Sequence, residues 1–218
     1  MKKVRLTIDG KEVSADGHAT LLQAARDAGI EIPTLCHDER LSPHGSCRLC
    51  SVELISGTKT RVVAACIYPV EDGLVVETSS PRIMEIRRVI LELLQAASPR
   101  GRIEELAGQY GSCKDKLEKE LTFCILCGLC VRYCRDIKGA NALGFIGRGV
   151  EKQVVFFPEI ARRHCPDCTG ECISLCPTGI LPNKYTCFVP SFGKSEPTVF
   201  PARLWDEDNF LNLTRNIE

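Results

Sequence analysis

The sequence predicts an α+β protein with two cysteine-rich parts, a helical connection between them and an extended arm. Short alternating segments surround one helical segment within residues 1–80, and apolar positions at helical spacing recur through residues 81–120. Eight cysteines stand in two closely spaced runs within residues 121–181, and prolines punctuate residues 182–218. These patterns indicate a small sheet domain, a linker, a cysteine-rich domain and a C-terminal arm, in that order.

The first part is predicted to be a small mixed sheet wrapped on one helix, which is a β-grasp arrangement. Residues 4–8 and 11–14 alternate polar and apolar side chains on either side of the Asp-Gly pair at 9–10, a hairpin signal. Thr20 is expected to cap a helix that ends at Gly29. Further strands are expected at residues 51–54, 61–65 and 74–77.

The linker is expected to consist of two helices. Ser80 is a suitable N-cap, and Pro81 occupies the first helical position. An apolar stripe at helical spacing follows, formed by Ile83, Ile86, Ile90, Leu93, Leu94 and Ala97. Residues 98–102 break this helix, and a second one is expected over residues 103–120 with an interruption at Gly111. The simplest role of the stripe is core packing.

Charge and hydropathy exclude several classes of partner. Lys plus Arg and Asp plus Glu both number 28, so no net field attracts nucleic acid or an anionic membrane. No apolar run approaches the roughly 20 residues of a membrane span, and the N-terminal segment lacks the apolar core of a signal peptide. We therefore expect a cytoplasmic chain without direct membrane insertion, whose 14 cysteines are metal ligands rather than disulfides.

The first cysteine group lies in the sheet domain and consists of Cys36, Cys47, Cys50 and Cys66. Gly45 and Ser46 precede its second member, and such small residues let main-chain N–H groups approach the sulfur atoms of an anionic cluster. Four cysteines in one small domain fit either a [2Fe–2S] cluster or a structural zinc ion. Zinc sites usually combine two short C-x2-C hooks, whereas this group has one, so the spacing favours a [2Fe–2S] cluster.

Two further groups are similar to the bacterial ferredoxin run C-x2-C-x2-C-x3-C-P, whose fourth cysteine binds the other cluster in two-cluster forms. By that analogy, one [4Fe–4S] cluster takes Cys124, Cys127, Cys130 and Cys176. The other [4Fe–4S] cluster takes Cys134, Cys165, Cys168 and Cys172. The second run carries one extra residue within 169–171 and lies far from the first. The crossed assignment, in which the fourth cysteine of each run binds the other run's cluster, is therefore an inference by analogy.

Two cysteines and the histidines are left over. Cys113 and Cys187 are expected to be small buried or free thiols, with a substitute ligand as the alternative. His37 and His164 each adjoin a proposed ligand, but a neighbouring residue normally points elsewhere.

Six of the 13 aromatic residues lie in the arm, at Tyr185, Phe188, Phe192, Phe200, Trp205 and Phe210. We expect these rings either to cover the cysteine-rich domain or to bind a partner.

Taken together, four segments resemble the N-terminal iron–sulfur module of the large NADH:quinone oxidoreductase subunit. They are residues 32–36 (IPTLC), 46–50 (SCRLC), 63–66 (VAAC) and 72–78 (DGLVVET). The diaphorase small subunit of NAD-linked hydrogenases and the iron-only hydrogenases share this module. The resemblance covers about residues 1–181. It implies a plant-type-like [2Fe–2S] domain (1–80), a helical linker (81–120) and a two-[4Fe–4S] ferredoxin domain (121–181), with the arm (182–218) beyond them.

The linker departs from that family in one respect. The family carries a His-Pro followed by three cysteines after the first linker helix, and these residues hold an additional [4Fe–4S] cluster. Residues 97–102 read ASPRGR here, so serine stands where the histidine would be and the cysteine loop is missing. We expect this cluster to be absent, which makes the linker a vestige of the region that holds it in the family. The hydrogenase domain is expected to be absent as well.

The resemblance implies an electron-transfer subunit that is not catalytic alone. The sequence contains no dinucleotide-binding glycine motif, P-loop, catalytic triad signature or flavin motif. The expected partners are an NAD(P)H-oxidising flavoprotein subunit and a second redox subunit in a hetero-oligomer, without nucleic acid. The alternatives are an independent ferredoxin-like carrier and a cluster-based redox sensor, which the zero net charge disfavours. The ten residues between Cys36 and Cys47 argue against a succinate or fumarate type of subunit.

Overall fold

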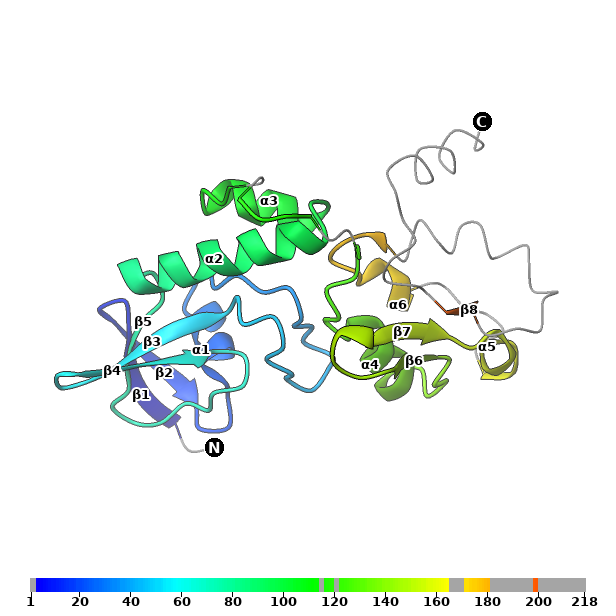
Figure 1. Ribbon diagram of the computed structural model, residues 1–218. Helices are drawn as coiled ribbons and strands as arrows, with labels where there is room; N and C mark the ends of the chain where they lie inside the picture. Colours follow the sequence, from blue (N-terminus) through cyan, green and yellow to red (C-terminus); the bar gives the residue numbers. More distant parts are fainter. Residues whose placement is uncertain (1–2, 114–115, 120–121, 165–170, 181–197, 200–218) are drawn as a thin grey trace. The chain divides into compact units, whose positions relative to one another are not determined.

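The structure is a computed structural model that describes residues 3–113, 116–119, 122–164, 171–180 and 198–199 (Figure 1). The chain divides into two compact units. Unit 1 comprises Met1–Leu91 and Ala107–Ser112, and unit 2 comprises Glu92–Leu106 and Cys113–Glu218. Each unit has a hydrophobic core of its own. No described helix is long and apolar enough to cross a membrane.

Unit 1 is built on a five-stranded mixed sheet with the strand order β2-β1-β5-β3-β4 (Figure 1). Its strands are β1 (Lys3–Ile8), β2 (Lys11–Asp16), β3 (Ser51–Ser56), β4 (Lys59–Ala64) and β5 (Val75–Glu77). Strands β1 and β5 are parallel, and the other neighbours are antiparallel. Helix α1 (Leu21–Asp27) contributes Leu21, Leu22, Ala24 and Ala25 to the core between helix and sheet. The predicted mixed sheet around one helix is thereby confirmed.

The turn between β1 and β2 also binds the residue that follows the central strand of the sheet. Asp9 and Gly10 both have positive φ, at 50° and 77°, which is the conformation of a tight hairpin turn. The Asp9 carboxylate accepts hydrogen bonds from the Thr78 N–H at 2.7 Å and from the Thr78 hydroxyl at 2.6 Å. Thr78 follows β5, so this side chain joins the first turn of the sheet to the end of its central strand.

Both predicted helix caps are confirmed. Thr20 forms a capping box with Gln23, in which each side chain bonds the other residue's main-chain N–H. The Ser80 hydroxyl accepts from the Ile83 N–H at 3.3 Å and donates to the Glu53 carboxylate at 2.7 Å. Ser80 therefore caps α2 (Pro81–Ala97) and also ties its first turn to β3.

The second linker helix is shorter than the sequence pattern predicts. Helix α3 spans Arg102–Gln109, whereas a helix was expected over 103–120. Gly111 has a φ of 61°, a left-handed conformation that an α-helix cannot continue through. The Ser112 N–H instead bonds the Ala107 carbonyl, and the described residues among 112–119 are not helical. The prediction of a merely interrupted helix was wrong because this glycine ends it.

Unit 2 combines short helices with a small antiparallel sheet of order β6-β7-β8 (Figure 1). Its further elements are α4 (Leu129–Asp136), β6 (Leu143–Ile146), η1 (Gly149–Glu151), β7 (Gln153–Phe156), α5 (Pro158–His164), α6 (Glu171–Ser174) and β8 (Thr198–Val199). None of these three strands is predicted from the sequence pattern. Within the arm (182–218), only β8 is described, and it pairs with β7. The other arm residues, including the six aromatic ones, lie outside the described residues.

Candidate iron–sulfur sites

None of the cysteines in the described part of the chain forms a disulfide, and those of the first group converge in unit 1. Cys36, Cys50 and Cys66 are each 1% exposed, whereas Cys47 is half-buried. Their sulfur atoms form two hydrogen-bonded pairs, Cys36 with Cys47 and Cys50 with Cys66. The charges of Cys36 and Cys47 also act on Cys66. The structure thus brings together all four residues predicted from the sequence.

The β3–β4 hairpin explains why Cys50 and Cys66 meet although they are far apart in the sequence. Ser51 pairs with Ala64 at the open end of this hairpin. The Ala65 N–H extends the pairing by one step and donates to the Cys50 carbonyl at 3.0 Å. Each of the two cysteines therefore lies just beyond the last paired residue of its own strand, at the same end of the sheet.

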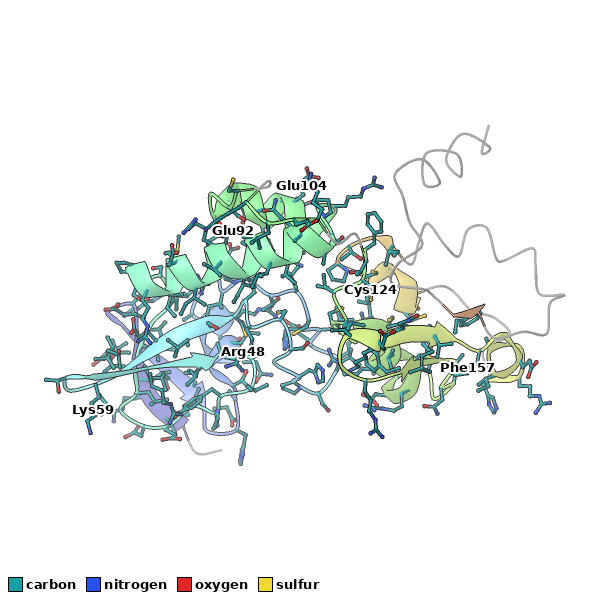
Figure 2. All side chains as sticks on the ribbon, viewed as in Figure 1. Arg48, Lys59, Glu92, Glu104, Cys124 and Phe157 are labelled. Atoms are coloured by element: carbon teal, nitrogen blue, oxygen red, sulfur yellow. The ribbon has the colours of Figure 1, made fainter. Side chains whose placement is uncertain are left out.

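Main-chain N–H groups surround these sulfur atoms. The Cys47 N–H donates to Cys36 Sγ at 3.3 Å, and the N–H groups of Ser46 and Gly45 donate to Cys36 and Cys66 respectively. Gly45 and Arg48 have left-handed φ values of 66° and 60°, which turn successive N–H groups toward one side. Such concave arrangements of N–H groups bind anions, including iron–sulfur clusters. Arg48 lies in the loop that precedes β3 (Figure 2).

The N–H donors and the thiol pairs shift the acidities of the cysteines. The hydrogen bond from the Cys36 thiol lowers the pKa of Cys47 to about 6, with further donation from the N–H groups of Leu49, Leu35 and Cys36. The same thiol–thiol bond and burial raise the pKa of Cys36. In the second pair, the mutual hydrogen bond raises the pKa of Cys50 and lowers that of Cys66. One member of each pair is thus favoured as a thiolate, the form that binds metal.

The pairing of the thiols distinguishes between the two kinds of metal site that the spacing allows. A structural zinc ion is a single metal ion with four ligands around it. A [2Fe–2S] cluster instead has two iron atoms and four thiolate ligands. Two pairs of thiols, three of them buried and with N–H donors aimed at the sulfur atoms, fit that cluster better than they fit a structural zinc ion.

The second group converges in unit 2 and includes a cysteine from the far run. Burial raises the pKa of Cys130, and the negative charges of Cys127, Cys124 and Cys176 raise it further. Cys127 and Cys130 are buried, and the other two are half-buried. The Thr178 hydroxyl lies 3.3 Å from Cys176 Sγ. The four residues that the crossed pattern assigns to one cluster therefore lie close enough to interact.

The loop that carries the first three of these cysteines holds an unusual main-chain conformation. Leu126 and Gly128 have φ values of 52° and 73°, so a left-handed residue follows shortly after Cys124 and another after Cys127. The conformation of Leu126 costs about 1–3 kcal/mol of strain, because its side chain disfavours positive φ. Gly128 is the N-cap of α4, and that helix carries the third cysteine. Cys124 lies in the segment ahead of α4 (Figure 2).

The third group is described only in part. Cys134 on α4 and Cys172 on α6 pack in the core of unit 2. The Ala142 N–H donates to Cys134 Sγ at 3.2 Å, which is again a main-chain donor on a sulfur atom. Cys165 and Cys168 lie outside the described residues. The assignment of a [4Fe–4S] cluster to this group therefore stays a prediction.

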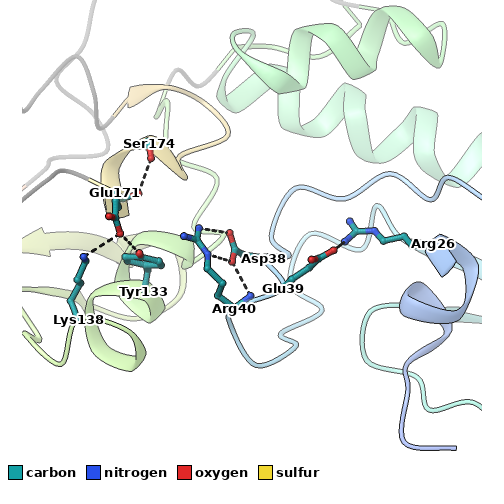
Figure 3. Close-up of polar contacts among 8 residues, drawn as sticks. All are labelled: Arg26, Asp38, Glu39, Arg40, Tyr133, Lys138, Glu171 and Ser174. Carbon is teal, nitrogen blue, oxygen red and sulfur yellow. Dashed lines mark hydrogen bonds and ion pairs between the residues drawn. The ribbon is translucent and has the colours of Figure 1, made fainter. Parts of the chain in front are cut away.

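A side-chain network joins the two helices that carry Cys134 and Cys172 (Figure 3). The Tyr133 hydroxyl donates to the Glu171 carboxylate, which also pairs with Lys138 at 3.1 Å. Tyr133 is 2% exposed, and its ring lies under the Lys138 ammonium. The cysteine pattern does not predict this network, although Tyr133 and Glu171 each stand directly before a proposed ligand.

The remaining cysteines and histidines differ in exposure. Cys113 is an exposed free thiol, and Cys187 lies outside the described residues. His37 is half-buried beside Cys36, whereas His164 is exposed at the end of α5.

Comparison with known proteins supports both kinds of cluster domain. Residues 1–81 match the 2Fe-2S iron-sulfur cluster binding domain family. Residues 115–182 match the ferredoxin-like domain of NADH-quinone oxidoreductase subunit 3. These matches show an iron–sulfur protein with a [2Fe–2S] ferredoxin-like domain followed by a [4Fe–4S] ferredoxin-like domain, as the sequence predicts.

Several curated relatives cover most of the chain. The mitochondrial NADH-ubiquinone oxidoreductase 78 kDa subunit of Neurospora crassa is 34% identical over 99% of this chain and 30% of its own length. An NADH-quinone oxidoreductase subunit of Rickettsia bellii is 31% identical over 93% of this chain and 31% of its own. The NADPH-Fe(3+) oxidoreductase subunit alpha of Geobacter sulfurreducens is 35% identical over 83% of this chain and 24% of its own. The chain thus spans less than a third of the length of these relatives.

A solved structure resembles the chain over most of both lengths. One chain of the NAD+-reducing [NiFe]-hydrogenase in the H2-reduced state has a TM-score of 0.68 and 29% identity. The match covers 81% of this chain and 85% of that one. These findings confirm the resemblance to the N-terminal iron–sulfur module.

Exchange of Cys134 tests the crossed assignment. In the Cys134→Ala variant, the cluster built on residues 165–172 should be perturbed, and the cluster of Cys124, Cys127 and Cys130 should remain. Paramagnetic resonance of the reduced variant, compared with Cys172→Ala, measures this. The two variants should lose the same signal, and loss of different signals would contradict the crossing.

The network on α4 and α6 predicts a second effect. Tyr133→Phe removes a hydrogen bond to a carboxylate, which stabilises a protein by roughly 1.5–3 kcal/mol. We expect the free energy of unfolding in urea to fall by about that amount and the resonance signal of the Cys134–Cys172 cluster to change. Tyr68→Phe in unit 1 is the control, because the Tyr68 ring contacts Arg61 instead. An unchanged signal in Tyr133→Phe would show that the network does not position these ligands.

Proposed function

Because the chain belongs with the N-terminal iron–sulfur module of the large NADH:quinone oxidoreductase subunit, we propose that it is an electron-transfer subunit. It passes single electrons between a flavoprotein that reacts with NADH or NADPH and a second redox partner. The observation that carries this proposal is the convergence of two separate cysteine groups, each within a core of its own unit. Convergent, buried thiols without a substrate-binding motif favour transfer of electrons over catalysis by this chain.

The proposed ligand sets follow the three cysteine groups. Cys36, Cys47, Cys50 and Cys66 hold one [2Fe–2S] cluster. Cys124, Cys127, Cys130 and Cys176 hold one [4Fe–4S] cluster. Cys134, Cys165, Cys168 and Cys172 hold the other, of which Cys134 and Cys172 share the core of unit 2. When bound, such clusters supply one-electron chemistry.

The chain's own residues then have three tasks. The cysteine thiolates hold the metal, and the core around Cys36, Cys50 and Cys66 excludes water from three of the four sulfur atoms. The main-chain N–H groups that donate to Cys36 and Cys134 stabilise negative charge on sulfur, which raises the potential of the site. The left-handed conformation of Arg48 helps to fix the direction of the donors in the first group.

The partners proposed for this chain are inferred from the complexes that its relatives form. Several relatives are subunits of NADH or NADPH oxidoreductases, and the structural neighbour belongs to an NAD+-reducing hydrogenase. A hetero-oligomer with a flavoprotein subunit and a second redox subunit accounts for both. Many closely spaced cysteines, none of them in a disulfide within the described part of the chain, suit a reducing compartment, so the proposed location is the cytoplasm.

The metal content tests the cluster inventory. The three ligand sets predict about ten iron atoms per chain, two from the [2Fe–2S] cluster and four from each [4Fe–4S] cluster. Iron and acid-labile sulfide assays on anaerobically purified protein measure this number. A reproducible value of about six would contradict the cluster assigned to the Cys134 group. A value of about fourteen would show that the chain holds the additional cluster that the linker is expected to lack.

Isolation from the native host tests the function itself. The chain should co-purify with a flavoprotein, and the complex should reduce an artificial acceptor with NADH or NADPH. The pure, flavin-free chain should keep its clusters and show no such turnover. Turnover by the pure chain would contradict the proposal, and a native chain that is stable and free of any flavoprotein would favour an independent carrier.

A further inference from the structure

A buried arginine contacts the main chain on both sides of a proposed ligand. Arg87 lies on α2 and is 2% exposed. Its Nε donates to the Leu49 carbonyl at 3.2 Å, and its Nη2 donates to the Ser51 carbonyl at 3.0 Å. These two residues flank Cys50, so one guanidinium holds the chain immediately before and after that sulfur-bearing residue.

The described surroundings of Arg87 leave its positive charge without a carboxylate in direct contact. Among the described residues, its hydrogen bonds go to the two carbonyls and to Tyr110, whose ring lies 5.6 Å from the guanidinium carbon. Burial lowers the pKa of Arg87, while Tyr110, Cys50 and Asp9 raise it. An arginine remains charged in proteins, so a cation lies within the buried surroundings of the Cys50 sulfur.

Such an arrangement is costly if its only purpose is stability. Removing a charge from water costs several kcal/mol, and apolar residues of similar volume often stabilise a core equally well. The carbonyl groups of Leu49 and Ser51 are neutral acceptors and do not cancel the charge. The neighbouring Arg88 provides a contrast, because it pairs with Glu85 at 2.6 Å near the surface of the same helix.

We infer that Arg87 is a positioning residue that raises the reduction potential of the [2Fe–2S] site by holding the Cys50 main chain and placing a buried positive charge beside it. This inference rests on the proposed function of the first cysteine group. Each electron that enters adds one negative charge to the site. A fixed cation in a medium of low dielectric stabilises the reduced form more than the oxidised form.

The reduction potential of the [2Fe–2S] site, followed by paramagnetic resonance during a redox titration of the full-length holoprotein, tests this inference. Arg87→Met removes the charge and both hydrogen bonds. At a fixed ambient potential, the ratio of reduced to oxidised centre should fall about tenfold, which is about 59 mV for one electron. Arg87→Lys keeps the charge, so most of the wild-type ratio should remain. Arg88→Met is the matched control and should leave the ratio unchanged.

A second neutral variant guards against failure of the first to fold. Arg87→Gln can still donate one hydrogen bond to a carbonyl, and it should show the same fall in the reduced fraction as Arg87→Met. An unchanged or increased reduced fraction in a neutral variant would overturn the inference, as would equal behaviour of the lysine and neutral variants. Absence of any [2Fe–2S] signal in the wild-type protein would instead refute the proposed function, so the two failures are distinguishable.

Discussion

The ligand sulfur atoms carry negative charge and lie mostly in the protein interior. They can be buried there only when hydrogen-bond donors surround them. A buried anion without such partners is strongly destabilising. Here the donors are main-chain N–H groups, as at Cys36 and Cys134. Side-chain donors would need additional ordered residues, whereas the main chain supplies one donor per residue wherever its conformation permits. The conformation of the ligand loops is therefore the constraint on which the rest of the structure depends.

That constraint explains why left-handed residues recur in the two cysteine loops. Arg48 stands between Cys47 and Cys50, and Leu126 stands between Cys124 and Cys127. Both have side chains that disfavour positive φ, so each conformation must be stabilised by the surrounding structure. In unit 1, β3 begins at Ser51 directly after this loop, and its register with β4 fixes that end of the loop. In unit 2, the N-terminus of α4 begins directly after the loop.

The sequence was sufficient for features that depend on local spacing. Thr20 and Ser80 were identifiable as caps, because each cap signal lies within a few residues of its helix. The extent of α3 could not be predicted, since the pattern does not show that Gly111 adopts a left-handed conformation. The strands β6 and β7 have four residues each and depend on pairing with one another rather than on a long alternating pattern.

The cysteine ligands stand in short sequence motifs, whereas the residues that surround them reach them through contacts between distant parts of the sequence. Arg87 lies 36 residues from Ser51, and Glu171 lies 38 residues from Tyr133, so no short motif records either contact. The two contacts also differ in charge. Arg87 is bound by neutral carbonyls, whereas Lys138 near Cys134 is matched by Glu171. Ligands of one kind can therefore experience different fields within one chain, and the residues that create this difference come from tertiary structure rather than from the cysteine motifs.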